Sequence, residues 1–177
     1  MQIQQDQAAL IRSTVAAILI GANTIAADRV DQERVDTIES GDSPRIIIIA
    51  DHTANTDSQG GTAVVFQVTL NLSIQMLVED AALTGVLAKA DTLTAQVKNA
   101  LFCAPAFTML IQNIASYRVV SAFKQGGDYI QGDVRLMVTA TWREIYNPTP
   151  GLALSAIGVT TAIGNDDTIV SQFTPGV

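Results

Sequence analysis

The most regular feature of the chain is an alternation of apolar and polar residues over 63–79. The apolar positions of this segment are Phe66, Val68, Leu70, Leu72, Ile74, Met76 and Val78. The positions between them are polar and are Gln67, Thr69, Asn71, Ser73, Gln75 and Glu79. Because successive side chains on a strand point to opposite faces, this pattern predicts a long strand in a sheet. One face of that sheet is covered, and the other meets water or a polar partner.

Two segments have helical spacing instead. In 82–101 the apolar residues form one stripe that can cover the apolar face of the long strand; they are Leu83, Val86, Leu87, Ala90, Leu93, Val97, Ala100 and Leu101. A first helix is predicted over about 5–20, with a buried side made of Ala8, Ile11, Val15, Ile18 and Leu19. Both helices are therefore expected to pack on the sheet.

Three further strands are predicted. Ile46–Ile49 is a run of four β-branched residues, which is typical of a strand in mid-sheet. The segments 115–123 and 130–142 alternate, and Gln125–Asp128 between them supplies the glycines that a tight antiparallel hairpin requires. Asp51–Thr62 has no apolar residue larger than alanine, so we expect a mobile loop there.

The two least regular parts of the chain differ in charge. Residues 28–42 hold six acids and two arginines, which suits an exposed short strand or loop. Residues 152–177 contain no Lys or Arg and little periodicity, which predicts an extended arm with enough apolar residues to dock on something. We therefore predict an α+β fold with a mostly antiparallel sheet of about four strands and two helices on one face. The domain spans 1–147, and 148–177 forms a C-terminal extension.

Composition narrows the range of partners. The chain has 177 residues, ten basic and seventeen acidic side chains and a net charge of −7, and it has no run of Lys and Arg. A surface that grips nucleic-acid phosphates is therefore not expected, although an acidic wall could let DNA slide past. No segment approaches the roughly 20 apolar residues that span a bilayer, so no membrane contact is expected. The single cysteine, Cys103, is predicted to be a small buried hydrophobic residue, and intracellular assembly fits.

The sequence contains no recognisable catalytic or metal-binding arrangement. His52 is the only histidine, and there is no GxSxG turn for a nucleophile. One His and one Cys cannot complete a zinc site, and the acids of 28–42 lack the spacing of a calcium loop. We expect no catalytic residues, no metal and no cofactor; a hydrolase that uses paired Asp and Glu residues stays an alternative.

The polar side of the long strand is unusual because most of its residues are neutral. A solvated strand face often carries Lys and Glu, whereas neutral polar residues can pack against another subunit without burying charge. This favours a subunit interface that includes Gln67, Thr69, Asn71, Ser73 and Gln75. An ordinary surface with few charges is the alternative.

The order of elements, together with the segments FQVTLNLSIQMLVED, QVKNAL and RLMVTATWREIYNP, resembles the tail terminator (tail completion) proteins of long-tailed bacteriophages over about 5–150. The extension after Leu152 is longer than in that family. The resemblance implies a non-enzymatic α+β protein that forms a ring, commonly a hexamer, on the finished tail tube. Such a ring stops tube polymerisation and joins the tube to the head. One alternative is another phage structural protein, such as a head–tail, head-completion, baseplate or minor tail protein. The other is a dimeric small-ligand binding module.

The resemblance also implies partners and contact residues. The partners are other copies of the chain, the tail tube protein and the head–tail connector or stopper protein, at the head-proximal end of a tail assembled in the host cytoplasm. Loop and hairpin-tip residues are expected to contact the tube or connector, namely His52, Asn55, Asp57, Gln59, Gln125 and Asp128. Acidic residues are expected to face the lumen or its rim so that DNA passes without specific binding, namely Asp28, Asp31, Glu33, Asp36, Glu39 and Asp42.

Overall fold

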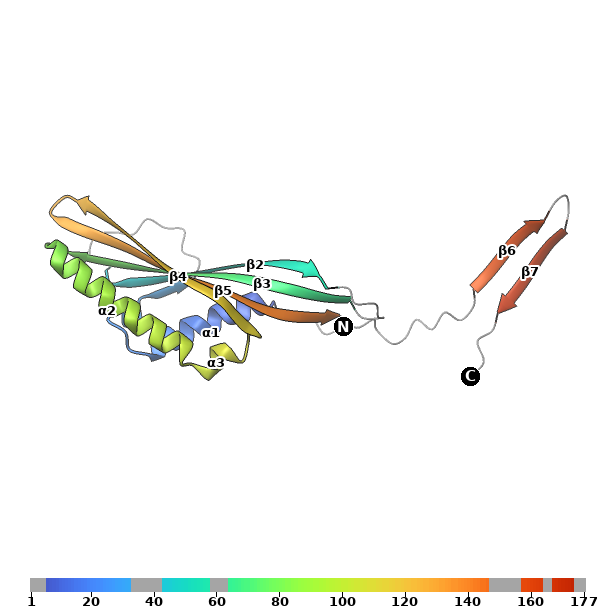
Figure 1. Ribbon diagram of the computed structural model, residues 1–177, viewed down its shortest axis with the longest axis horizontal. Coiled ribbons are helices and arrows are strands. Elements are labelled where there is room, and N and C mark those ends of the chain that lie inside the picture. Colours follow the sequence, from blue (N-terminus) through green and yellow to red (C-terminus); the bar gives the residue numbers. More distant parts are fainter. Residues whose placement is uncertain (1–5, 33–42, 58–63, 147–156, 164–166, 174–177) are drawn as a thin grey trace.

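The computed structural model describes residues 6–32, 43–57, 64–146, 157–163 and 167–173. Its main body is a five-stranded sheet with helices on one face, as Figure 1 shows. The elements are α1 (Gln7–Gly21), β1 (Val30–Gln32), β2 (Arg45–Thr56), β3 (Val64–Asp80), α2 (Leu83–Phe102), α3 (Pro105–Thr108), β4 (Asn113–Gly126) and β5 (Tyr129–Tyr146). The predicted α+β class and the helix layer on one face are confirmed.

The sheet has the strand order β1-β2-β3-β5-β4. All neighbours are antiparallel except β1, which runs parallel to β2 and places Val30–Gln32 beside Ile46–Ile48. This edge strand makes five strands where the sequence predicted about four. The short strand expected within 28–42 is thus present at its start, and residues 33–42 lie outside the described part.

The core lies between the helices and the central strands. The apolar face of β3 is buried from Val68 to Val78, and Phe66 is half-buried. Register pairs it with residues of β5 that are also buried, Val134, Leu136, Val138 and Ala140. The helix α2 adds five fully or nearly buried residues, Val86, Ala90, Leu93, Val97 and Leu101. Leu83 and Leu87, which the sequence placed in the same stripe, remain exposed.

The remaining boundaries follow from local hydrogen bonding. The Asp6 side chain accepts a hydrogen bond from the Ala8 N–H at 3.0 Å and caps α1, so the helix begins slightly later than predicted. At the β4–β5 hairpin, Gly127 has φ of 67°, the left-handed conformation that the sequence predicted for this turn.

Two predictions about single segments are wrong. Asp51–Thr56 is the outer half of β2 and not a loop, because β3 is long enough to supply backbone partners as far as Phe66 opposite Thr56. Polar residues are tolerated there because they are exposed. Cys103 is exposed and not buried, because it follows the end of α2, where the chain turns.

The C-terminal part contains more structure than its composition suggests. The strands β6 (Ile157–Ile163) and β7 (Asp167–Phe173) form a separate two-stranded antiparallel sheet. Its register pairs Ile157 with Phe173 and Ile163 with Asp167. The low periodicity of this arm did not predict these strands, and the boundary at 147/148 stays a prediction.

Candidate functional site on the helix-free face of the sheet and its edges

The polar residues of β3 lie on the face opposite the helices. Asn71 is exposed, whereas Gln67, Thr69, Ser73 and Gln75 are half-buried among side chains of their own subunit. The Gln75 Nε2 atom donates a hydrogen bond to the Asp133 Oδ2 atom at 2.9 Å. These residues are therefore partly satisfied within one chain, and whether they also contact a second subunit stays a prediction.

The neighbouring strands bring charges to the same face. Arg45 pairs with Asp31, Arg135 with Asp133 at 3.0 Å and Arg143 with Asp57 at 2.6 Å. The hydrogen bond from Asp133 raises the pKa of the Arg135 guanidinium above its ordinary value. The face is thus neutral only along its β3 centre, a feature that inspection of one strand could not reveal.

Apolar side chains also lie on this face. Ile49, Val120 and Met137 are 45%, 38% and 47% exposed. A shallow pocket of about 150 Å³ is lined in part by Ile49, Asn71 and Met137. Mixed apolar and hydrogen-bonding surfaces of this kind are suited to protein contacts.

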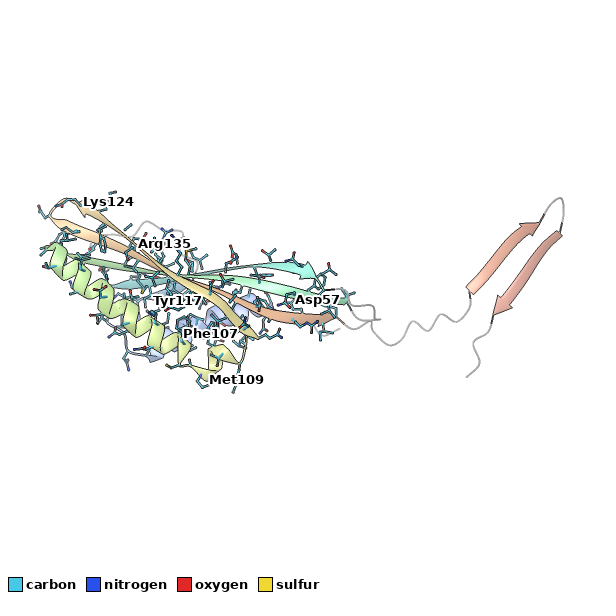
Figure 2. The ribbon with its side chains drawn as sticks, viewed as in Figure 1. Asp57, Phe107, Met109, Tyr117, Lys124 and Arg135 are labelled. Atoms are coloured by element: carbon cyan, nitrogen blue, oxygen red, sulfur yellow. The ribbon has the colours of Figure 1, made fainter. Side chains whose placement is uncertain are left out.

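The residues expected to contact the tube or connector fall into two groups. His52 and Asn55 are exposed on β2 and Asp57 follows it, while Gln59 lies outside the described residues. Gln125 and Asp128 are exposed at the β4–β5 hairpin. Strand register pairs Asn55 with Gln67, and Gln67 with Arg143, at one end of the sheet. It pairs Gln125 with Ile130 at the other end. In Figure 2, Asp57 marks one end of the sheet and Lys124 marks the other. The structure therefore does not bring the two groups together.

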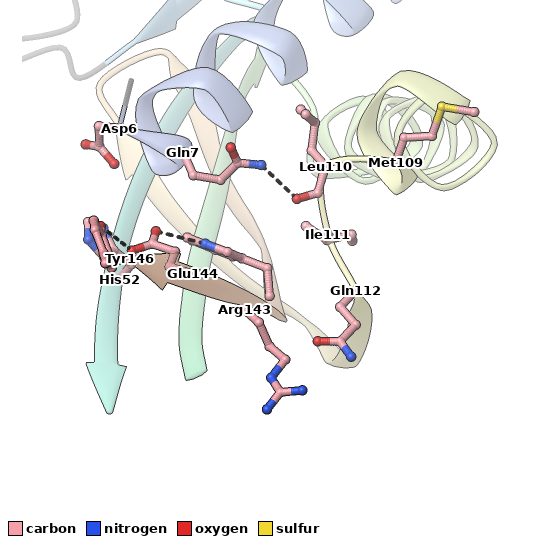
Figure 3. Close-up of a pocket in the computed structure, with 11 residues that line it drawn as sticks. Asp6, Gln7, His52, Met109, Leu110, Ile111, Gln112, Arg143, Glu144 and Tyr146 are labelled. Carbon is pink, nitrogen blue, oxygen red and sulfur yellow. Dashed lines mark hydrogen bonds between the residues drawn. The ribbon is translucent and has the colours of Figure 1, made fainter. Parts of the chain in front are cut away.

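A pocket of about 650 Å³ lies at the end of the sheet where β2 finishes, which is called the β2 end below (Figure 3). Trp142 Nε1 and the Tyr146 hydroxyl both donate to Glu144, at 3.0 and 2.9 Å, and the hydrogen bond to Glu144 raises the pKa of Tyr146. The ring centroids of His52 and Trp142 lie 6.2 Å apart. Met109 at the pocket's rim is 84% exposed. This arrangement offers an aromatic and amphipathic recognition surface.

The expected acidic lumen residues are only partly placed by the structure. Asp28 is exposed, and Asp31 is half-buried in its pair with Arg45. The other four expected residues lie outside the described part and are Glu33, Asp36, Glu39 and Asp42. The acidic lumen therefore stays a prediction.

Comparisons with known proteins give little beyond this geometry. No protein-family model matches the sequence, and no curated protein matches it. One chain of a solved structure described as "Virion of native gene transfer agent (GTA) particle" is similar to this chain with a TM-score of 0.44 and 11% identity. That similarity covers 78% of this chain and 100% of the other.

Among the described ranges, no group of three or more His, Cys, Asp or Glu residues could hold a metal ion. Within those ranges, no helix has the length and apolar character needed to cross a membrane.

The exposure of β4 along almost its whole length was not predicted from the sequence. Every residue of this strand except Ile114 is exposed, including Tyr117, Val119 and Phe123. Arg118 and Lys124 on β4 are also exposed and form no ion pair with any residue that the structure describes. The signal that could have revealed this strand is its two basic residues with no acid between them.

Proposed function

We propose that this chain is a structural virion protein that closes as a ring on the end of a phage tail tube. The ring stops tube polymerisation and provides the joint to the head connector. The main support for this proposal is that one long sheet has exposed polar residues at both of its ends. A joint between two different structures needs two such ends on one rigid body.

Each end has features suited to a protein contact. The hairpin end carries Gln125 near the end of β4 and Asp128 in the tight two-residue turn. The β2 end carries His52 and Asn55 beside the aromatic pocket. In this proposal one end meets the tail tube protein and the other meets the connector or stopper protein.

The remaining surface assignments belong to the same proposal. The helix-free face, with Gln67, Thr69, Asn71, Ser73 and Gln75, meets other virion subunits. The acids near 28–42 face the channel or its rim, where like charge keeps DNA from sticking. The net charge of −7 supports this assignment.

The direct test is to mix the purified chain with tail tubes that lack a cap and to image them by electron microscopy. We expect a ring at one end of each tube and a fixed tube length when the protein is present during polymerisation. Solution mass measurement in parallel separates a ring from the dimer expected of a small-ligand binding module.

Two matched variants sharpen this test. Asp128→Lys changes only the hairpin end, and Met109→Lys changes only the rim of the pocket at the β2 end. We expect one variant to lose tube capping and the other to cap tubes that no longer join heads. Failure of the unmodified protein to bind tubes, or normal capping and head joining by both variants, would refute the proposal.

A further inference from the structure

The sheet has two open edges among the described residues. One is β4, which pairs only with β5. The other is the outer half of β2, because β1 covers β2 only as far as Ile48 and leaves Ile49–Thr56 without a described neighbour on that side. An open strand edge presents unpaired backbone N–H and C=O groups and is a template for pairing with another chain.

The two edges carry opposite charges on the same face. Arg118 and Lys124 lie on the helix-free face of β4, because register places them opposite Met137 and Gln131 of β5. Asp51 lies on the helix-free face of β2 opposite Asn71, and Asp57 joins that face through its ion pair with Arg143. The basic edge and the acidic edge are therefore complementary between copies.

The spacing of these charges is also matched. Arg118 and Lys124 are six positions apart, and Asp51 and Asp57 are six positions apart. In an antiparallel pair of strands a single register therefore places Lys124 opposite Asp51 and Arg118 opposite Asp57. Oppositely charged residues directly across two strands stabilise the pairing.

We propose that copies of this chain join edge to edge, with β4 of one copy paired antiparallel to the outer half of β2 of the next in this register. The inference rests on the proposed ring and specifies its subunit joint. The Asp57 N–H donates to the Val65 carbonyl, so the backbone N–H and C=O groups of odd-numbered residues in this part of the chain point toward β3. Those of the even-numbered residues of β2 point toward its open edge. On β4 the two-residue hairpin pairs Gly126 with Tyr129, so odd-numbered residues face its open edge. The proposed register places the even-numbered residues of β2 opposite the odd-numbered residues of β4, so the backbone groups at the two open edges can hydrogen-bond to each other.

The helix side of this register is also compatible. It places Phe123, which is 40% exposed, opposite His52, whose ring already lies beside Trp142. It places Ser121 and Val119 opposite the small residues Ala54 and Thr56. The β4 strand ends at Gly126 opposite Ile49, where the cover by β1 has just stopped. The paired part of β4 thus uses the whole open stretch of β2 and ends where the cover by β1 begins.

This joint connects two unlike surfaces of the chain. Such head-to-tail contacts generate a ring when the rotation between copies closes. The antiparallel direction continues that of the sheet, so all copies keep their helices on one side. The register also staggers neighbours along the strands, which a closed barrel requires.

The test is disulfide trapping of the full chain in a Cys103→Ser background. Residues directly opposite in a non-hydrogen-bonded antiparallel pair have Cα atoms about 4.5 Å apart, within disulfide reach. We expect Lys124→Cys combined with Asp51→Cys to give a ladder of covalent multimers after mild oxidation, both in solution and on capped tubes.

The matched control is Lys124→Cys combined with Thr53→Cys, which shifts the pair by two residues on the same face. It should give on the order of tenfold less cross-linked product, because diagonal neighbours lie about 7–8 Å apart. A charge swap provides a second readout. Lys124→Glu should lower the assembled mass, and adding Asp51→Lys should restore it.

The outcomes separate this inference from the proposed function. Absence of the ladder, an equal ladder from the shifted pair, or a charge swap that fails to restore assembly overturns the edge joint. Capped tubes without the ladder reject the edge joint alone. A ladder from a protein that never binds tubes keeps the joint and rejects the tail role.

Discussion

The two faces of the same sheet differ in what their side chains contact. On β5, Leu136 is 0% exposed beneath the helices, whereas the next residue, Met137, is 47% exposed on the opposite face. The covered face is apolar along both central strands. The helix-free face mixes neutral polar residues, ion pairs and isolated apolar residues.

This difference separates stability from interaction. Burial of apolar area supplies most of the folding free energy, so the covered face holds the domain together. Exposed ion pairs contribute about 0–1 kcal/mol each, so the helix-free face can change without unfolding the chain. Contacts with other subunits can therefore be built on that face and on the sheet edges.

The largest expected effect comes from truncating the covered face. Leu136→Ala should lower the free energy of unfolding by about 2–5 kcal/mol, because it leaves a cavity among fully buried side chains. Met137→Ala on the other face is the matched control and should change it by less than about 0.5 kcal/mol. Urea unfolding followed by circular dichroism measures both. Equal losses would show that the two faces do not divide stability and contact as described.

An intermediate effect is expected at Gly132 of β5, which lies against Val86 of α2. A Cβ atom added to Gly132 would lie 2.9 Å from both Val78 Cγ2 and Val86 Cγ1. Both neighbours are buried, so Gly132→Ala should cost about 1–3 kcal/mol through overpacking. Thermal unfolding measures the loss.

The control for that substitution is Gly126→Ala at the end of β4. An added Cβ there would meet only the flexible Gln131 side chain, at 3.4 Å. Its stability should stay within about 0.5 kcal/mol of the unmodified chain. A Gly132→Ala protein as stable as this control would mean that α2 can move away from β5 at little cost.

Sequence reasoning predicted the parts of this protein that depend on one strand or helix at a time. The alternation of β3 gave both its faces, and the stripe of α2 gave Val86, Leu93 and Val97 as core residues. Apart from the β4–β5 hairpin, which the turn residues between its strands predicted, features that depend on pairing between strands were not predicted. The polar composition of the segment after Ala50 predicts a loop, and only its pairing with β3 makes it a strand.

The candidate site shows the same limit. The ion pairs of Arg135 and Arg143 depend on strand register, and their presence on the neutral face could not be read from β3 alone. The residues expected to contact the tube or connector lie at opposite ends of the sheet, a separation that follows from strand register and not from the sequence of any one segment. The equal spacing of the charges on β2 and β4 suggests a contact only because the fold leaves an edge of each strand open.

The smallest expected effect concerns a half-buried carboxylate between the end of β3 and the start of α2. Asp80 lies 2.8 Å from Lys89 and accepts a hydrogen bond from the Ala82 N–H at 3.1 Å. The Lys89 ammonium lowers the pKa of Asp80 below its ordinary value of 3.8. A lowered pKa in the folded state means that the ionised carboxylate stabilises the fold above pH 3.8, and that this contribution is lost as the pH falls through the folded-state pKa.

Asp80→Asn isolates this charge because the amide oxygen can still accept from Ala82. The variant should therefore melt at a slightly lower temperature than the unmodified chain at neutral pH. The difference should shrink as the pH falls below 3.8, because the native carboxylate then becomes protonated as well. Melting temperatures recorded across this range test the prediction. A difference in melting temperature that stays constant with pH would contradict the prediction, because it would show that the charge of residue 80 does not stabilise the fold.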